Sequence, residues 1–449
     1  MVNDTIASIS TALGKGAISI VRLSGEDSIS IVNNVFSGKD LSTVSTHTVH
    51  YGHIRFEGRN IDEVLVTVFR APKTFTTEDI VEINCHGGVF VANKILEIIL
   101  SLGARAANPG EFTERAFLNG RIDLTQAEAV MDVIEAKSEL SLSLANKGLD
   151  GVIYKLITNL REQLLAIIAH IEVNIDYPEY DDVIELSNNI VKPEIEKLQV
   201  RINNILEKAS YGRIIKDGVK TAIIGRPNVG KSSLLNALLR EDKAIVTEIQ
   251  GTTRDIVEGQ INIGGIILNL IDTAGIRDSL DVVEIIGISK AKEVIKEAEL
   301  ILFVLDNTKE LTEEDKSLLK LTEDKQRIII INKVDLSKAL THKFTNSVEV
   351  SALNQTGIED LENIIRKLFL SGEVNLKDQT YVSNSRHIAK LRETISSLND
   401  SIKAIGDELP IDMVEMDLKE AWYILGEIIG DTSSTSLIDE LFSKFCLGK

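Results

Sequence analysis

The chain has 449 residues, of which 43% are hydrophobic, and this predicts two to four domains with full cores. It carries 68 acidic and 49 basic residues, a net charge of −19, so it is a poor general binder of nucleic acid, and any RNA contact must be local or come through a partner. It has no apolar stretch of about 18 residues and no secretion signal, which predicts a cytoplasmic protein without a membrane-spanning segment. Its two cysteines, Cys85 and Cys446, are too few for a disulfide framework.

Residues 1–118 are expected to form a mixed domain of short strands and helices. Strands are predicted over residues 5–10, 17–23, 64–69 and 80–84, and a helix over Val89–Ser101. The next segment, 119–212, carries apolar residues three and four positions apart over 124–146 and 149–175, which is the spacing of buried helix faces. Pro178 and Pro193 interrupt this helical pattern.

The segment 213–375 alternates strands with helices. Strands are predicted over Val219–Ile224, 266–271 and 327–331, a helix over 233–240, and a hairpin over 259–270 that turns at 262–265. A helical pattern returns from about residue 385 to the last residue. The helices before and after the alternating segment should pack together, which makes that segment an insertion held by two connections, as exposed loop tips tolerate.

The sequence Gly225-Arg-Pro-Asn-Val-Gly-Lys-Ser232 fits the phosphate-binding P-loop pattern G-x-x-x-x-G-K-[ST]. It lies between a predicted strand and a predicted helix, where backbone N–H groups and the helix dipole favour an anion. We expect Lys231 to reach the β- and γ-phosphates of a nucleotide and the Ser232 hydroxyl to bind Mg²⁺. A bare pattern of this kind occurs by chance, so the segments that follow it in order decide its meaning.

Two of those segments are predicted to face the γ-phosphate. Gly251-Thr-Thr-Arg-Asp255 supplies Thr253, whose hydroxyl can bind Mg²⁺ and sense the γ-phosphate. Asp272-Thr-Ala-Gly275 ends a predicted strand, so Asp272 would hold Mg²⁺ through water and the Gly275 N–H would meet the γ-phosphate.

Two further segments, Asn332-Lys-Val-Asp335 and Ser351-Ala-Leu353, are predicted to bind guanine. Asp335 can accept hydrogen bonds from the N1–H and the exocyclic amine of guanine, and adenine would leave this carboxylate unsatisfied. Each segment alone can be an ordinary turn, but the five in this order predict a GTPase. The predicted GTP-binding positions are Asn228, Val229, Gly230, Lys231, Ser232, Ser233, Thr247, Glu248, Ile249, Gln250, Gly251, Thr252, Thr253, Asp272, Thr273, Ala274, Gly275, Asn332, Lys333, Asp335, Ser351, Ala352 and Leu353.

Hydrolysis in this chain needs a device that Ras does not use, because Ile276 stands where Ras has a glutamine that orients water. Asn228 can help to bind K⁺ together with carbonyl oxygens of the loop 247–252. The cation would offset the negative charge between the phosphates of GTP, as an arginine finger does in other GTPases. The loop ligands expected for K⁺ are Thr247, Ile249 and Thr252. Glu284 can orient the attacking water if its loop closes, and the alternative is a solvated charge on a mobile loop.

These motifs predict a multidomain fold of α/β and all-α parts. An α/β N-terminal domain, residues 1–118, precedes a helical domain in two parts, 119–212 and 376–449. The helical domain is interrupted by an inserted Ras-like P-loop GTPase domain, 213–375, with a mostly parallel sheet.

From end to end the chain resembles the MnmE (TrmE) family of tRNA-modification GTPases. The GTPase motifs fit several bacterial families, and the more specific resemblance lies near the two ends of the sequence. It is carried by Asp4-Thr-Ile-Ala7, Val21-Arg-Leu-Ser-Gly25, Val81-Glu82, His86-Gly-Gly88, Pro109-Gly-Glu-Phe-Thr-Glu-Arg-Ala-Phe-Leu-Asn119, Asp123-Leu-Thr-Gln-Ala-Glu-Ala129 and Phe445-Cys-Leu-Gly-Lys449. The sequence departs from the family at two places. Gly14-Lys-Gly-Ala17 holds fewer glycines than is usual in the family. Arg121 stands where the family can carry lysine, and arginine keeps the positive charge but presents its hydrogen-bond donors in a different shape.

The resemblance implies that the N-terminal domain binds 5-formyltetrahydrofolate or a related reduced folate as a one-carbon source. The positions that match the family's folate contacts are Arg22, Glu82, Arg121 and Lys449. Without the resemblance, each of these residues would be read as a surface charge. Family members also need the cysteine at the position of Cys446 for modification. The residues predicted as catalytic are therefore Cys446, Lys231, Asp272 and Glu284. The role of Cys446 is open between a nucleophile, a general acid and a packing residue.

By the same resemblance, the chain is expected to act as a homodimer on C5 of the wobble uridine of tRNA. A flavoprotein partner, MnmG, would carry FAD, folate would supply the carbon, and glycine or ammonia the nitrogen. The alternative is a regulatory or ribosome-assembly GTPase without modification activity. The folate motifs and Cys446-Leu-Gly-Lys449 favour modification, because a pure switch needs neither.

Overall fold

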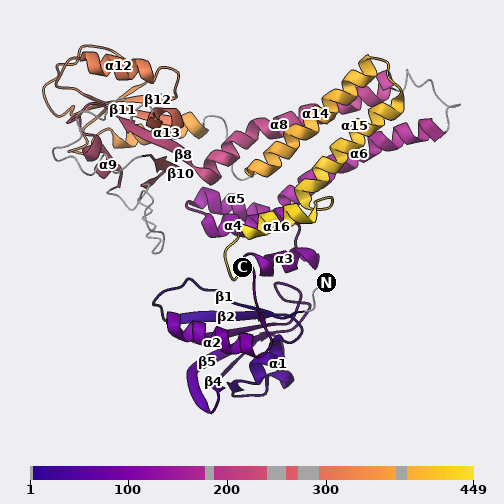
Figure 1. Cartoon of the computed structure of the whole chain (residues 1–449). Coiled ribbons are helices and arrows are strands. Elements are labelled where there is room, and N and C mark those ends of the chain that lie inside the picture. The colour runs from indigo at the N-terminus through magenta and orange to yellow at the C-terminus, as the bar shows by residue number, and fades with distance from the viewer. Residues whose placement is uncertain (1–3, 177–186, 240–258, 272–292, 371–381) are drawn as a thin grey trace. The chain divides into compact units, whose positions relative to one another are not determined.

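The computed structural model of the chain describes residues 4–176, 187–239, 259–271, 293–370 and 382–449 (Figure 1). These residues divide into two compact units. The first unit comprises Met1–Met131, Gly148–Tyr180 and Asp407–Lys449, and the second comprises Asp132–Lys147 and Asp181–Gly406.

The first unit is built on a seven-stranded sheet with the order β3-β4-β5-β6-β2-β1-β7. Neighbouring strands are antiparallel except β1 and β7, which are parallel. The strands are β1 (Ile6–Ile9), β2 (Ile18–Ser24), β3 (Phe36–Ser37), β4 (Thr48–Phe56), β5 (Arg59–Phe69), β6 (Ile80–His86) and β7 (Arg105–Ala106). Apolar side chains of α1 (Ser28–Asn33), the 3₁₀ turn η1 (Leu41–Thr43) and α2 (Val89–Ser101) share one core with this sheet.

Alternation along β2 and β6 decides which side chains lie away from that core. Val21, Leu23 and Ile83 are fully buried in it. Arg22 and Glu82 are paired opposite each other in the β2–β6 register and are only half-buried. Because successive side chains of a strand point to opposite faces, these two charged residues lie on the sheet face that the core helices do not cover.

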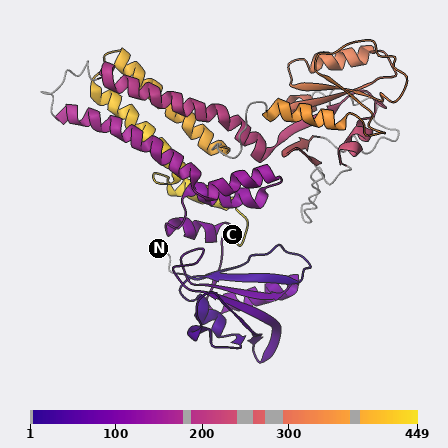
Figure 2. The ribbon, with the colours of Figure 1, turned by 180° about the vertical axis from the view of Figure 1, so that it is seen from behind.

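Helices complete the first unit around and beyond the sheet. They are α3 (Glu111–Leu118), α4 (Leu124–Glu135), α6 (Val152–Asp176), α15 (Ile411–Ile429) and α16 (Thr435–Ser443). The helix α6 runs beside α15, and α16 packs on α3 (Figure 1 and Figure 2). The Arg161 guanidinium lies 3.9 Å from the centre of the Trp422 ring, which joins α6 to α15 by a cation–π contact.

In the second unit, α8 (Lys192–Asp217) runs beside α14 (Ser385–Gly406), and the Gln199 amide donates to Asn399 Oδ1 at 2.9 Å. A π-helical turn, η2 (Ser187–Val191), precedes α8, and Pro193 stands in the first turn of α8, where its missing N–H costs nothing. The pairs α6–α15 and α8–α14 each join a helix before the GTPase segment to one after it. The expected pairing of the two helical segments is therefore confirmed.

One element differs from the prediction. A single helix was expected over 124–146, and the chain forms two, α4 and α5 (Glu139–Leu149). The Ser138 hydroxyl accepts the Ser141 N–H at 3.1 Å, and the Ser138 carbonyl accepts the Leu142 N–H at 2.9 Å. Ser138 thus caps a new helix, which the unbroken apolar spacing of the sequence did not reveal.

The second unit also contains a six-stranded sheet with the order β13-β12-β11-β8-β10-β9. All neighbours are parallel except the hairpin β9–β10. The strands are β8 (Val219–Ile224), β9 (Gln260–Ile263), β10 (Ile266–Leu270), β11 (Leu300–Asp306), β12 (Arg327–Asn332) and β13 (Ser347–Val350). The helices α9 (Lys231–Leu239) and α13 (Ile358–Leu370) bury residues in one core, and α12 (Glu313–Leu321) in a second core. Helices on both faces explain why the neighbouring strands β11 and β12 are almost continuously apolar.

Candidate functional site

The P-loop joins the carboxyl end of β8 to the start of α9, as its sequence predicts. Two of its glycines are needed because other atoms approach their backbone closely. A Cβ at Gly225 would lie 2.4 Å from the Val304 carbonyl oxygen, and a Cβ at Gly230 would lie 2.2 Å from the Asn332 amide nitrogen. The loop is therefore packed against β11 and against the end of β12, where the guanine segment begins.

The Lys231 ammonium lies over this loop. It donates to the carbonyl oxygens of Gly225 and Arg226, each at 2.8 Å. Burial lowers the pKa of Lys231, while the nearby Glu314 carboxylate acts in the opposite direction. A phosphate placed beside this half-buried ammonium would favour its charged form.

Both guanine segments are bonded to the P-loop or to each other. The Asn332 amide donates to the Val229 carbonyl at 2.9 Å and accepts the Ala352 N–H at 3.1 Å. The Ser351 hydroxyl donates to Asp335 Oδ1 at 2.6 Å, and the Asp335 side chain lies exposed beyond β12. The structure thus brings the P-loop and the two predicted guanine segments together.

Lys333 connects the same two regions. Its ammonium donates to the Asn228 carbonyl at 2.7 Å and to the buried Asp306 carboxylate at 2.7 Å. Burial works against ionisation of Asp306, but hydrogen bonds from Lys333 and Thr308 hold its pKa below the usual value. Asn228 has a positive φ of 63°, a conformation that asparagine tolerates better than most residues.

Sequence reasoning missed a buried ion pair behind the P-loop. Arg226 Nε donates to Asp315 Oδ1 at 2.8 Å, and the Asp315 side chain is only 1% exposed. Asp315 Oδ2 accepts the Thr312 N–H at 3.0 Å and the Thr312 hydroxyl at 2.8 Å, which completes a capping box at the start of α12. The spacing of Thr312 and Asp315 could have shown the cap, but nothing in the sequence shows its partner.

Several predicted positions lie outside the described residues. They include the magnesium ligand Thr253, the loop positions Thr247, Glu248, Ile249, Gln250, Gly251 and Thr252, the segment Asp272, Thr273, Ala274 and Gly275, and also Ile276 and Glu284. Ser232, the other predicted magnesium ligand, lies in the first turn of α9 beside the exposed Ser233. Its place after Lys231 fits a hydroxyl ligand for Mg²⁺.

The predicted folate residues gather around two phenylalanines of the first unit. Arg22 forms an ion pair with Glu82 at 2.8 Å, and its guanidinium lies 5.8 Å from the centre of the Phe112 ring. Arg121 lies 5.0 Å from the centre of the Phe75 ring and donates to the Phe75 carbonyl at 3.0 Å. Phe75 and Phe112 share one apolar cluster, so both arginines border the same aromatic pair.

The C-terminal segment 446–449 reaches this cluster through backbone hydrogen bonds. The Phe112 N–H donates to the Lys449 carbonyl at 3.2 Å, and the Gly110 N–H donates to the Cys446 carbonyl at 3.3 Å. Gly110 has a φ of 72°, and a Cβ there would lie 2.7 Å from the Phe442 carbonyl. The main chain of Lys449 therefore lies next to Phe112, whose ring the Arg22 guanidinium borders, and the Cys446 side chain is exposed.

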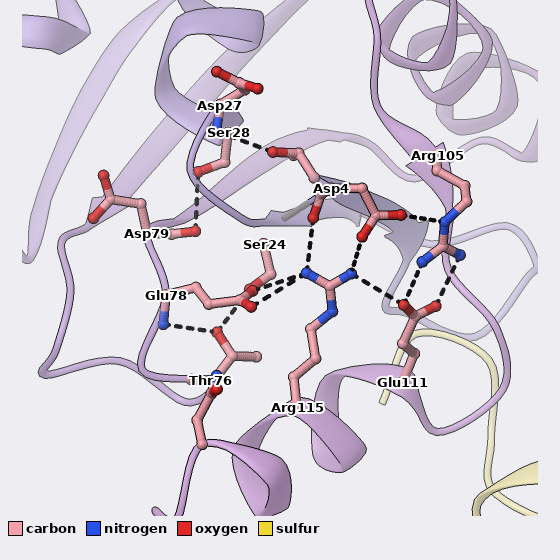
Figure 3. Close-up of polar contacts among 12 residues, drawn as sticks. Asp4, Ser24, Asp27, Ser28, Thr76, Glu78, Asp79, Arg105, Glu111 and Arg115 are labelled. Carbon is pink, nitrogen blue, oxygen red and sulfur yellow. Dashed lines mark hydrogen bonds and ion pairs between the residues drawn. The ribbon is translucent and has the colours of Figure 1, made fainter. Parts of the chain in front are cut away.

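An ionic network in the same unit is centred on Arg115 (Figure 3). Arg105 bonds Asp4 and Glu111, and Arg115 bonds both of these carboxylates and also Glu78. The hydrogen bond from Arg105, aided by Arg115 and opposed by burial, holds the pKa of Asp4 below its usual value. Burial alone would raise the pKa of Glu111, but bonds from Arg105, the Asn108 N–H and Arg115 outweigh it and lower that pKa.

Comparison with known families follows the same division of the chain. The family described as "MnmE helical domain" matches residues 124–446, and "GTP-binding protein TrmE N-terminus" matches residues 5–121. A "tRNA modification GTPase MnmE" of Bacillus mycoides is 53% identical, and one of Bacillus cytotoxicus is 52% identical, each over 99% of both chains. The chain belongs to the MnmE family of tRNA modification GTPases. It is therefore a GTP hydrolase that acts in tRNA modification.

The chain is also similar to solved structures. Aquifex aeolicus Era bound to GDP.AlF4- is 27% identical, with 40% of this chain and 66% of that chain covered and a TM-score of 0.24. Among the described residues of this MnmE-family chain, no helix has the length and apolar character needed to cross a bilayer.

The exposed Asp335 beside Ser351 gives a test of nucleotide choice. The wild-type chain is expected to bind GTP and not ATP, and Asp335→Asn should weaken GTP binding by about 10²-fold, because the amide oxygen can accept only one of the two guanine hydrogen bonds, without charge, and the new NH2 group faces the second guanine donor. The new amide should shift preference towards xanthosine triphosphate, whose C2 oxo group can accept from it. Titration with fluorescent nucleotides measures all three affinities, and equal wild-type affinity for ATP and GTP would contradict the assignment.

The ionic network predicts that the first unit loses stability in acid. The pKa values of Asp4 and Glu111 lie below their ordinary values of 3.8 and 4.5, so their contribution is complete above those values and is lost as the pH falls through the lowered ones. Trp422, the one tryptophan of the sequence, lies in this unit, so its fluorescence can follow urea unfolding at pH 3 to 7. Glu111→Gln should reduce the slope below pH 4.5, and an unchanged slope would contradict this account.

Proposed function

We propose that this chain, together with the flavoprotein MnmG, converts C5 of the wobble uridine of tRNA to aminomethyl-type derivatives such as carboxymethylaminomethyl. A reduced folate, 5-formyltetrahydrofolate or a relative, would bind to this chain and supply the carbon, while FAD would belong to the partner. The observation that supports this most is that Arg22 and Arg121 border one aromatic pair, while Glu82 is ion-paired with Arg22 and the main chain of Lys449 is bonded to Phe112. Scattered surface charges would have no reason to converge there.

The residues present fit a folate. The Glu82 carboxylate is half-buried on the open sheet face and can accept hydrogen bonds from the amino group and ring N–H of a pterin. Arg22 pairs directly with that carboxylate at 2.8 Å and so fixes its position. The exposed Arg121 and the Lys449 ammonium can pair with the carboxylates of a glutamyl tail.

The proposed GTPase cycle uses Mg²⁺ at Ser232 and Thr253, with Asp272 behind a water ligand and Lys231 on the phosphates. K⁺ would be held by Asn228, Thr247, Ile249 and Thr252. The support among the described residues is that the Lys333 ammonium donates to the Asn228 carbonyl and so holds this part of the P-loop in place. Glu284 would orient the attacking water, and the cation would promote closure of two GTPase domains in a homodimer.

The domain boundaries that we propose are 1–118, 119–212, 213–375 and 376–449, in a cytoplasmic protein. Membership of a tRNA-modification family favours modification over the alternative of a regulatory or ribosome-assembly switch. The site favours it too, because the segment that carries Cys446 is bonded to the helix that carries Phe112. A chemical role for Cys446 is part of the proposal, and a packing role is the competing reading.

Cation dependence tests the hydrolytic part of this proposal. K⁺ should speed GTP hydrolysis well beyond Na⁺, because Na⁺ is too small for a site formed by loop carbonyls. Asn228→Ala should weaken the effect while sparing much of GDP binding. Phosphate release measured in the two salts at matched ionic strength decides, and identical rates would remove the cation from the mechanism.

The modification chemistry is tested with Cys446→Ser, which keeps the size and a polar atom but removes the thiol. If the thiol reacts, the variant should hydrolyse GTP at the wild-type rate and fail to modify tRNA, measured by mass spectrometry of wobble uridines in cells that carry only the variant.

Glu82→Ala should spare hydrolysis and lose folate binding, whereas Asp272→Ala should lose hydrolysis and modification together. Full modification by Cys446→Ser would reduce Cys446 to a packing residue, and full modification by Asp272→Ala would separate hydrolysis from the chemistry.

A further inference from the structure

We propose that Arg115 is a positioning residue for the folate site, and this inference rests on the function proposed above. Arg115 does not border the aromatic pair itself. Arg115 is only 8% exposed. Its guanidinium joins α3, the helix that carries Phe112, to the loop 74–79, which carries Phe75 (Figure 3).

The first half of the site depends on the register of α3. Phe112 lies one turn before Arg115 on this helix, borders the Arg22 guanidinium, and gives its N–H to the Lys449 carbonyl. Any rotation or slide of α3 would therefore move Phe112 away from Arg22 and Lys449 together.

The second half depends on the loop 74–79. This loop presents the Phe75 ring and carbonyl to Arg121, and its Thr76 carbonyl accepts the Asn119 amide at 2.7 Å. Inside the loop, the Thr74 hydroxyl donates to the Glu78 carbonyl at 2.6 Å, so the position of Glu78 fixes the turn that carries Phe75.

Arg115 connects these two halves. Its Nη1 donates to both Glu78 oxygens at 3.2 Å and to the Asp4 carbonyl at 2.9 Å. Its Nη2 donates to Asp4 Oδ1 at 2.6 Å and to Glu111 Oε1 at 3.1 Å. Ser24 of β2 donates to Glu78 Oε2 at 2.7 Å, which ties the loop to the strand of Arg22.

Arginine suits this position because one planar guanidinium can reach three carboxylates at once. A lysine ammonium is a compact charge with three donors and cannot reproduce that fork. Without the Arg115 guanidinium, the Glu78 carboxylate would lie near the carboxylates of Asp4 and Glu111 with no cation bonded to it. We therefore expect the loop 74–79 to move away from α3.

Arg105 provides a matched control. It bonds the same Asp4 and Glu111 carboxylates, but Glu78 is not among its partners, and its side chain is 42% exposed. Arg105→Lys therefore disturbs the network without releasing the loop 74–79. Glu78→Gln is a second variant on the loop side, since its amide oxygen can still accept from Ser24 while its charge for Arg115 is lost.

The experiment compares the wild-type chain with Arg115→Lys, Glu78→Gln, their double variant and Arg105→Lys. Calorimetric titration with 5-formyltetrahydrofolate measures affinity, hydrogen exchange measures protection of peptides over 70–79, and GTP hydrolysis confirms an intact second unit. Arg115→Lys and Glu78→Gln should each weaken folate binding about tenfold, as expected when a charge-assisted bond is lost, and should speed exchange in the loop. The double variant should be no weaker than either single one, and Arg105→Lys should bind folate as the wild type does.

The outcomes separate this inference from the proposed function. No folate binding by the wild-type chain would overturn the proposed function and the inference with it. Wild-type folate affinity in Arg115→Lys with only a lower unfolding temperature would overturn the inference alone, because a merely structural arginine gives that result. Equal weakening by Arg105→Lys would also overturn it, and if Arg115→Lys does not fold, Glu78→Gln carries the same comparison.

Discussion

The attachment of the C-terminal segment to the N-terminal domain determines how the rest of the first unit is arranged. Backbone hydrogen bonds join Cys446 and Lys449 to the start of α3, and Ser10 donates to the Gly448 carbonyl at 3.1 Å. Phe442 and Phe445 are buried in the cluster of Leu124, and burial of a phenylalanine contributes about 1.5–3 kcal/mol. Because the two ends of the chain meet in this way, the helices between them must return, and the GTPase segment becomes an insertion.

The second unit depends on its P-loop in a comparable way. The loop is bonded to the end of β12 through Asn332 and Lys333 and to the start of α12 through Arg226. Each contact uses a backbone carbonyl of the loop or a buried side chain, so the loop has little freedom of its own. A nucleotide that binds here therefore meets a phosphate loop and a guanine segment already held in one geometry, which lowers the entropic cost of binding.

For the described residues, the sequence predicted that the P-loop and the two guanine segments would lie together, because these segments are short and each lies at the end of a strand. A parallel sheet brings such ends to one edge, so the order along the chain was enough to place Asn332 and Asp335 beside the P-loop. The break at Ser138 was not predicted, because a serine cap does not disturb the apolar spacing around it. The pairing of Arg226 with Asp315 could not be predicted, since the two side chains are 89 positions apart and only the fold brings them together.

The folate candidates show the same limit more sharply. Resemblance named Arg22, Glu82, Arg121 and Lys449, but it did not show that Phe75 and Phe112 lie among them. Those contacts depend on the packing of α3 against β1 and the loop 74–79, which a linear pattern does not encode. Pro109 and Gly110 entered the sequence analysis only as part of a family motif, and the structure adds that Gly110 makes room for Phe442.

The two sites belong to different compact units, so any coupling between hydrolysis and modification needs a physical route. The covalent route runs through three helices: α14 follows the GTPase segment, α15 and α16 follow α14, and the segment with Cys446 comes directly after α16. The segment with Cys446 is bonded to α3. On α3, Arg115 bonds Glu78 of the loop 74–79, and Phe112 borders Arg22 in the proposed folate site. If GTP binding changes the affinity for folate through these elements, linkage requires folate to change the affinity for GTP by the same factor.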